Sequence, residues 1–197
     1  SADDGASAIK ELLQTALDQP QGPVHIDLST QQAAAPLANG EPGPNDAPPP
    51  AKADLTAAQA LLANATRPVI VAGLQAREAP AAAALATLVT ALECPVLATY
   101  KAKGVFPEND QRCIGLFTGA TAEVDCISGA DLIIFFGLDP IELIPQAWRL
   151  PAPVLDLSPV AGQPHPVEPT AAVADPLALS VGRLVDGVRK SDWTGAE

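Results

Sequence analysis

The strongest strand signal in the chain is Asp131-Leu-Ile-Ile-Phe-Phe-Gly137, an uninterrupted apolar run that ends in glycine. A strand that is apolar on both faces is typical of parallel sheets, which other elements cover on both sides. The run is far shorter than the roughly 20 apolar residues that a membrane span requires. It therefore predicts a buried central strand and no membrane partner.

Shorter apolar runs flank this strand, and helical patterns separate them. Pro80 to Glu93 is rich in Ala and Leu and predicts a helix with Pro80 in its first turn. Strands that alternate with helices predict a parallel sheet with right-handed crossovers, and hence an α/β fold. The other predicted strands are Pro68–Gly73, Pro95–Thr99, Pro153–Leu157 and Ala171–Ala174. The other predicted helices are one near Leu55–Leu62 with Asp54 as its cap, Thr121–Ser128 and Leu177–Val188.

Three zones divide the chain before its last residues. Residues 1–30 predict a helix over Ala6–Asp18 and a strand over Val24–Leu28, a pair that cannot bury its faces alone, so we expect the end of a preceding domain. Residues 31–53 are rich in proline and alanine and predict an extended linker, with a ligand for an SH3-like module as the alternative. Residues 54–190 carry the α/β pattern, and 191–197 form a tail. The absence of methionine favours excision from a longer chain.

Charge and cysteine usage exclude several classes of partner. A net charge of −12 with scattered Lys and Arg argues against nucleic acid, because a phosphate-binding face needs clustered basic residues. Cys94, Cys113 and Cys126 form no CxxC pair. They predict small buried apolar side chains in a reducing, cytoplasmic compartment, and neither a disulfide nor a zinc framework.

Catalytic motifs are absent from the sequence, which contains no GxSxG, HExxH, P-loop or GxGxxG. His25 is expected on the solvent side of its strand, and His165 in a loop. Asp139 and Glu142 follow the strongest strand and form a candidate pair for metal binding or acid–base catalysis. Without histidine partners, roles in the loop and as a cap are favoured for both.

The ends of three predicted strands form a candidate ligand crevice, because ligands of open parallel sheets bind at the carboxyl ends of the strands. Such a crevice could hold an adenosine diphosphate group. Glycines at strand ends are equally typical of plain turns, so both interpretations stay open. The strand ends are Gly73-Leu74-Gln75, Thr99-Tyr100-Lys101 and Gly137-Leu138-Asp139, and Gly119-Ala-Thr121 opens a nearby helix.

Several motifs resemble, in order and spacing, the central domain of thiamine-diphosphate-dependent enzymes, with acetolactate synthase and its relatives as the closest likeness. The most specific is Lys103-Gly104-Val-Phe106-Pro107-Glu108. Gly22 to Leu28 resembles the last strand of the pyrimidine-binding domain that precedes the central domain in this family. The other matching motifs are Arg67–Gly73, Cys94–Thr99, Ile114-Gly115, Gly119 and Ala130–Gly137.

This resemblance implies a Rossmann-like fold of the DHS-like NAD/FAD-binding type, with about six parallel strands and helices on both faces. It implies a non-catalytic part of a larger transferase or lyase that acts on 2-oxo acids. Thiamine diphosphate and magnesium would lie between the other domains of the same polypeptide, held by a glutamate of the preceding domain and a GDG…N motif. No GDG triplet occurs here. The resemblance also implies subunit packing in a homo-oligomeric parent.

The same resemblance implies FAD, CoA, an ADP-type nucleotide or nothing in the crevice. Members that bind FAD usually carry an arginine where this chain has Asp139, and a carboxylate there would repel a diphosphate by roughly 1 kcal/mol. The alternatives are a stand-alone nucleotide-binding protein, similar to sirtuins or electron-transfer flavoproteins, and a structural interaction module. The predicted cofactor-binding residues are Gly73, Leu74, Thr99, Tyr100, Lys101, Gly119, Gly137, Leu138 and Asp139.

Overall fold

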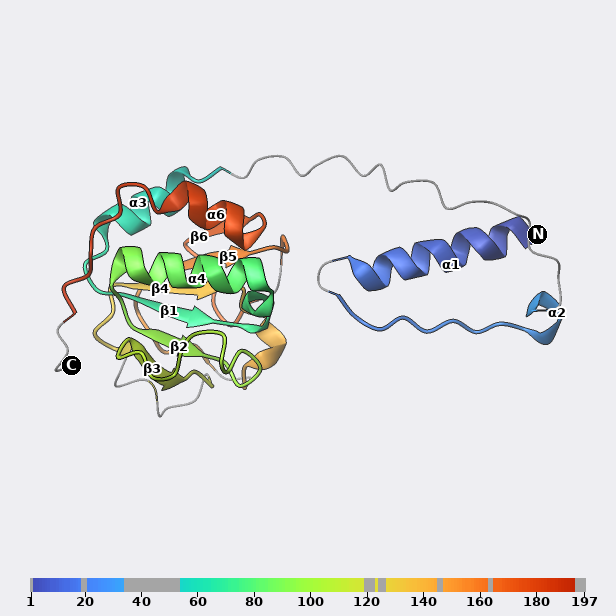
Figure 1. Cartoon of the computed structure of the whole chain (residues 1–197), viewed down its shortest axis with the longest axis horizontal. Helices are drawn as coiled ribbons and strands as arrows, with labels where there is room; N and C mark the ends of the chain where they lie inside the picture. The colour runs from blue at the N-terminus through green and yellow to red at the C-terminus, as the bar shows by residue number, and fades with distance from the viewer. Residues whose placement is uncertain are drawn as a thin grey trace. The chain divides into compact units, whose positions relative to one another are not determined.

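The structure is a computed structural model that describes residues 2–18, 21–33, 54–118, 123, 127–144, 147–162 and 165–193. By its contacts the chain divides into two compact units, Ser1–Pro50 and Ala51–Glu197. The first unit contains α1 (Ala2–Leu17) and the short α2 (Thr30–Ala33), drawn in blue in Figure 1. No helix in the described part of the chain is long and apolar enough to cross a membrane.

The segment between α1 and α2 differs from the sequence prediction. Residues 21–29 form neither helix nor strand, so the strand predicted over Val24–Leu28 is wrong. Alternation of apolar and polar residues is only one requirement of a strand, since its N–H and C=O groups also need a neighbouring strand to pair with. Within the described residues of this unit no such neighbour exists. The predicted helix is present and begins at Ala2, four positions before the predicted Ala6.

The second unit is built on one six-stranded sheet in the order β3-β2-β1-β4-β5-β6. Every neighbouring pair of strands is parallel. The order runs outward in opposite directions from β1 and β4, as in doubly wound Rossmann-like folds. The α/β fold with a six-stranded parallel sheet is therefore confirmed. The strands are β1 (Pro68–Ala72), β2 (Val96–Ala98), β3 (Cys113–Leu116), β4 (Leu132–Phe136), β5 (Val154–Ser158) and β6 (Ala171–Ala174).

The sequence patterns located every strand except β3. This strand lies at the edge of the sheet, and its register against β2 shifts between Val96 and Leu97. Gly115 interrupts it with a φ of +126°, and the neighbouring Ile114 is exposed. An exposed edge strand with an irregular register lacks the continuous apolar run that marks β1 and β4.

Side chains of the central strands alternate between two apolar clusters, one on each face of the sheet. In β1, Ile70 and Ala72 join one cluster, and Val69 and Val71 join the other. The first cluster is completed by α3 (Thr56–Asn64), α4 (Ala79–Leu92) and α6 (Leu177–Leu184), which lie together above the sheet in Figure 1. The second is completed by side chains from the loops, namely Phe117, Leu138, Trp148 and Leu150, and by Ile127. Most of the helix predicted over Thr121–Ser128 lies outside the described residues.

Local signals set the ends of these helices. The carboxylate of Asp54 accepts hydrogen bonds from the N–H of Thr56, at 2.9 Å, and from its hydroxyl, at 2.7 Å. These two bonds lower the pKa of Asp54 and satisfy the N–H of the first helical residue, but the N-cap position is Leu55, one residue after the predicted cap. Pro80 lies in the first turn of α4, as predicted. The last helix ends at Leu184, before the predicted Val188, and Gly187 follows with a φ of +85°.

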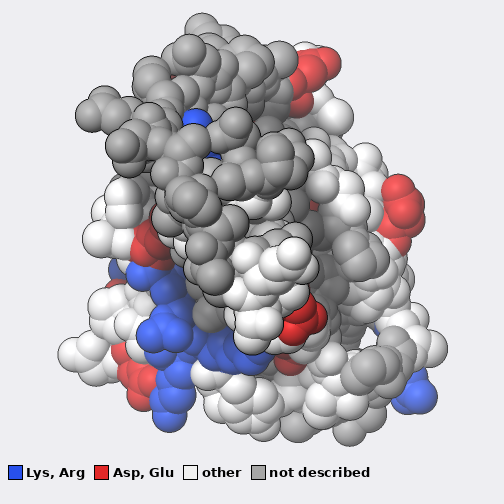
Figure 2. Space-filling view, turned by 90° about the vertical axis from the view of Figure 1, so that its right-hand side faces the viewer, with Lys and Arg blue, Asp and Glu red and all other residues white. Residues whose placement is uncertain are grey.

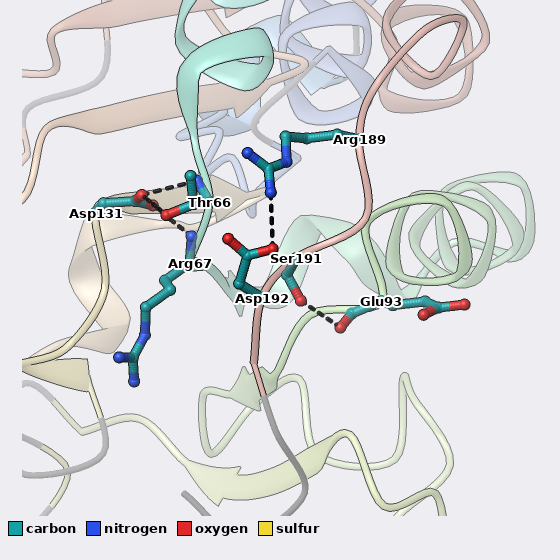
Figure 3. A network of polar contacts seen from close by, with 7 residues as sticks. All are labelled: Thr66, Arg67, Glu93, Asp131, Arg189, Ser191 and Asp192. Carbon is teal, nitrogen blue, oxygen red and sulfur yellow. Dashed lines mark hydrogen bonds and ion pairs between the residues drawn. The ribbon is translucent and has the colours of Figure 1, made fainter.

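The chain after α6 returns to the amino-terminal edge of the sheet and forms what we call the strap, Arg189–Trp193. Figure 3 shows it beside the start of β1 and the end of α4. The N–H of Ser191 donates to the carbonyl of Leu92, and the N–H of Asp192 donates to the carbonyl of Thr66, each at 2.7 Å. The hydroxyl of Ser191 also donates to the carbonyl of Glu93 at 2.7 Å, and Arg189 pairs with Asp192 at the same distance.

Asp131, just before β4, organises the same edge of the sheet (Figure 3). Its carboxylate accepts the N–H and the hydroxyl of Thr66, both at 2.7 Å, and the N–H of Arg67 at 2.8 Å. Burial alone would raise the pKa of this carboxyl group, but the three hydrogen bonds outweigh that effect and lower it. Asp131 thereby joins the start of β1 to the start of β4.

Trp193 fastens the strap to β1. Its indole N–H donates to the carbonyl of Pro68 at 2.8 Å, and the guanidinium carbon of Arg67 lies 4.1 Å from the centre of its ring. The ring also packs against both apolar clusters. A half-buried aromatic ring with a satisfied N–H and a stacked cation is a strong local anchor.

Replacing Trp193 tests how much the strap contributes to stability. We expect Trp193→Ala to lower the free energy of unfolding by about 2–3 kcal/mol, because packing, the hydrogen bond and the cation–π contact are all lost. Trp193→Phe keeps a ring and should cost about 1 kcal/mol, the typical net value of the missing hydrogen bond. Urea unfolding followed by circular dichroism measures both values. Equal stability of the two variants would show that the ring itself contributes nothing.

Candidate functional site

The carboxyl ends of β1, β2 and β4 meet at one place, which we call the crevice. The N–H of Gly73 donates to the carbonyl of Phe136 at 3.0 Å, and the N–H of Thr99 donates to the carbonyl of Ala72 at 2.9 Å. These bonds hold the first residue after each strand beside its neighbour. The strand order reverses between β1 and β4, where doubly wound sheets bind their ligands. Three predicted strand ends are thus brought together.

Glu142 lies within this crevice, at the end of the short 3-10 helix η2 (Pro140–Glu142). Its Oε2 accepts the N–H of Leu74 at 2.7 Å and the N–H of Asp139 at 3.1 Å. Its Oε1 accepts the hydroxyl of Thr99 at 2.6 Å. One carboxylate therefore binds donors from the ends of all three strands, and those donors belong to residues predicted to contact a cofactor.

Asp139 takes a different part in the same loop. Its side chain accepts the N–H of Ile141 at 3.1 Å, so it caps the turn that leads into η2. This agrees with the favoured loop-and-cap role. In the described residues no three His, Cys, Asp or Glu side chains group as metal ligands. The carboxylate that faces the strand ends is therefore that of Glu142 and not, as predicted, that of Asp139.

Two glycines allow the loops after β1 and β4 to touch directly. A Cβ on Gly73 would lie 2.4 Å from Leu138 Cα, 2.5 Å from the carbonyl oxygen of Gly137 and 2.9 Å from Glu142 Oε2. Gly137 has a φ of +60°, and a Cβ on it would lie 2.9 Å from the backbone nitrogen of Ala76. Backbone therefore lies against backbone at the point where a dinucleotide would enter such a fold.

Two of the remaining predicted residues, Tyr100 and Lys101, lie in the turn after β2. Tyr100 is 63% exposed and Lys101 is also exposed, while Gly119 lies outside the described residues. Lys103 is exposed too and lies 3.8 Å from Glu108. Figure 2 shows Lys and Arg side chains gathered in one area, with acidic side chains at its margin. The backbone N–H of Ala102 donates to both the carbonyl and the hydroxyl of Thr99, which fixes the turn after β2.

A second polar contact, Asp156 with His165, lies among apolar side chains on one face of the sheet. His165 Nε2 is 3.0 Å from Asp156 Oδ2, and the two side chains are 4% and 6% exposed. The His165 ring is 5.8 Å from that of Phe135, centre to centre. His165 does lie in a loop, as predicted, but its burial and its partner were missed. The signal available in the sequence was Asp156 itself, an acidic residue within an apolar strand.

The other histidine is exposed as predicted, and of the two described cysteines only Cys94 shows the predicted burial. His25 is 86% exposed and 3.8 Å from Asp27, on the solvent side of its segment. Cys94 is buried, and its burial raises the pKa of the thiol to about 12. Cys113 is half-buried in β3, and Cys126 lies outside the described residues. Cys94 is thus a packed apolar side chain and not a nucleophile.

Comparison with known proteins gives a consistent family. Residues 55–152 match the family described as "Thiamine pyrophosphate enzyme, central domain". Pyruvate decarboxylase 3 of Oryza sativa subsp. indica is 33% identical over 146 residues, which cover 68% of this chain and 25% of that protein. Acetolactate synthase large subunit IlvG of Mycobacterium tuberculosis is 31% identical over 155 residues, which cover 76% of this chain and 26% of that protein.

A solved structure supports the same fold. The thiamine diphosphate-dependent 4-hydroxybenzoylformate decarboxylase of Rhodococcus jostii RHA1 superposes with a TM-score of 0.71 at 23% identity, covering 98% of this chain and 39% of that one. At this identity the likeness shows the fold alone. The chain spans about a quarter of the length of the curated relatives that it matches.

The direct contact between the two loops predicts a large effect of Gly73→Ala. The new methyl group would overlap the backbone of Gly137 and Leu138, which cannot move aside as a flexible side chain can. We expect a loss of at least about 2 kcal/mol in the free energy of unfolding.

Gly182→Ala is the matched control for that variant, because a Cβ at this exposed position in α6 meets nothing within 4 Å. It should stabilise the domain by about 0.5–1 kcal/mol, since alanine is the better helix former. Urea unfolding measures both. A Gly73→Ala protein as stable as wild type would contradict the close approach.

The pKa of Cys94 predicts a thiol that does not react in the folded protein. At pH 8 a group with a pKa of about 12 is almost entirely protonated, and burial blocks the reagent as well. Iodoacetamide labelling mapped by peptide mass spectrometry should modify Cys113 well before Cys94. In urea Cys94 should be modified readily. Fast labelling of Cys94 in the native protein would contradict its burial.

Proposed function

Residues 55–152 belong to the family of thiamine pyrophosphate enzyme central domains, and we propose that this domain is the non-catalytic scaffold of a larger enzyme acting on 2-oxo acids. The family match is the observation that carries the proposal. One relative is named for the decarboxylation of pyruvate, a 2-oxo acid, and another for the synthesis of acetolactate. The reaction class would be that of a transferase or a lyase.

The scaffold role is supported by the packing and the polar contacts of the described residues. The sheet is packed on both faces, and its polar groups at the carboxyl edge bind one another. Thiamine diphosphate and Mg²⁺ are proposed to be bound by other domains of the same polypeptide. A cytoplasmic, homo-oligomeric parent completes this proposal, with the central domain contributing to subunit packing.

Nucleotide binding is the second candidate function, and one observation favours it. The predicted residues of β1, β2 and β4 do meet at the point where strand order reverses, the usual place for an ADP-type group or FAD in such sheets. The group nevertheless does not fit the residues present. Glu142 already takes the donors that a phosphate would need, and the loops around Gly73 and Gly137 touch. The scaffold role is therefore the one that the geometry supports best.

Assays of this chain and of the full-length parent test the proposal. With thiamine diphosphate, Mg²⁺ and pyruvate, the chain alone should release no carbon dioxide and form no acetolactate. The parent should consume pyruvate or another 2-oxo acid, and omitting thiamine diphosphate should abolish that activity. Turnover by the chain alone, or a parent whose activity is independent of thiamine diphosphate, would contradict the proposal.

A further inference from the structure

We propose that Glu142 is a built-in anion that closes the nucleotide crevice of this domain, so that the crevice holds its own carboxylate and excludes the phosphates of FAD or ADP. The inference deepens the scaffold function proposed above. It rests on the contacts of Glu142 itself, which hold whatever reaction the parent performs.

The donors around Glu142 are those that bind phosphate in folds of this class. Backbone N–H groups at the carboxyl ends of strands form concave anion sites, and a nearby hydroxyl often adds a further donor. Here the N–H groups of Leu74 and Asp139 and the hydroxyl of Thr99 converge on two carboxylate oxygens. A carboxylate presents negatively charged acceptor oxygens as a phosphate does, so it can satisfy the same donors.

The contacts are short enough to be strong. The bonds from Thr99 and Leu74 measure 2.6 and 2.7 Å, within the range of hydrogen bonds to a charged acceptor. The Thr99 residue is fully buried, and the carboxylate of Glu142 is the acceptor that its hydroxyl reaches. Loss of Glu142 would leave the hydroxyl of the buried Thr99 without its acceptor, which costs more than a hydrogen bond is worth in itself, and would also remove the acceptor from the half-buried Leu74 and Asp139.

Charge and tethering both favour Glu142 over an external phosphate. A phosphate placed beside the carboxylate would be repelled, and one that replaced it would have to displace a group held nearby by its own chain. The close approach at Gly73 and Gly137 adds a steric barrier on the β1–β4 side of the crevice. Residue 142 is thus a specificity-determining position, because its carboxylate prevents the phosphates of a nucleotide from binding at the strand ends.

Variants of Glu142 test this role, with Glu108 as the matched control. Glu108 is 56% exposed, and its ion pair with Lys103 is long, at 3.8 Å. Glu108→Ala therefore removes the same charge without leaving a group of hydrogen-bond donors unpaired. We expect Glu142→Ala to lower the unfolding temperature by about 5 °C or more and Glu108→Ala by less than about 1 °C. Glu142→Gln keeps the shape but loses the charge, and should fall between them.

Anion binding is then measured by thermal shift and calorimetry with inorganic phosphate, ADP and FAD. In Glu142→Ala the vacated donors should bind phosphate or ADP, raising the unfolding temperature by about 2 °C or more at saturating ligand. The wild-type protein and Glu108→Ala should show no saturable binding of any of the three. Saturable binding of ADP or FAD by wild type would overturn the proposal, as would a Glu142→Ala protein that loses stability and gains no anion binding.

If Glu142→Ala does not fold, amide hydrogen exchange on the wild-type protein tests whether Glu142 binds the N–H groups of the strand ends. The amides of Leu74 and Asp139 have Glu142 as their acceptor and should exchange at least about 100-fold more slowly than exposed loop amides. In Glu142→Gln the side-chain oxygen is an uncharged and weaker acceptor, so the same two amides should exchange faster than in wild type. Unprotected amides in wild type would contradict the proposal. The family assignment would still hold, because it rests on the sequence.

Discussion

The pairing of β1 with β4 is the constraint on which the rest of the domain depends. Both strands are buried at every position, so each needs a packed layer on both sides of the sheet. Their five paired positions set the register from which β2 and β5 extend the sheet in opposite directions. Because the two strands end level, the loops that follow them meet. The close contact at Gly73 and Gly137 is therefore a consequence of the pairing.

That contact explains how the usual ligand-binding place of such a fold can be occupied by the chain itself, without a ligand. The strand ends present N–H groups that must find acceptors once they are buried. A bound phosphate is one acceptor, and a side chain of the same chain is another. Here Glu142 supplies it and at the same time joins the ends of three strands. The polar groups of the crevice become part of the packing, which agrees with the scaffold role proposed for this domain.

Sequence patterns recovered the parts of this structure that depend on local order. The continuous apolar runs located β1 and β4, and shorter apolar runs between helical patterns located β2, β5 and β6. The strand β3 was missed because its irregular register and Gly115 break the periodic signal. The strand proposed over Val24–Leu28 is absent because periodicity does not supply a pairing partner.

The candidate site was predicted to the level of strand ends and no further. Thr99 and Leu74 lie 43 and 68 positions from Glu142, and nothing local indicates which of two nearby carboxylates turns inward. Asp139 was chosen because it stands where relatives that bind FAD usually carry an arginine, but the turn that leads into η2 uses its side chain as a cap. Only the folded backbone decides between residues three positions apart.

The strap at the amino-terminal edge has a mechanical consequence. Arg189–Trp193 is held at Thr66, Leu92 and Pro68, so tension applied beyond Trp193 reaches the sheet before it reaches α6. The load is divided between the start of β1 and the end of α4, and α6 carries it last. Because Trp193 packs against both apolar clusters, the same tension also acts on the packing of both faces of the sheet.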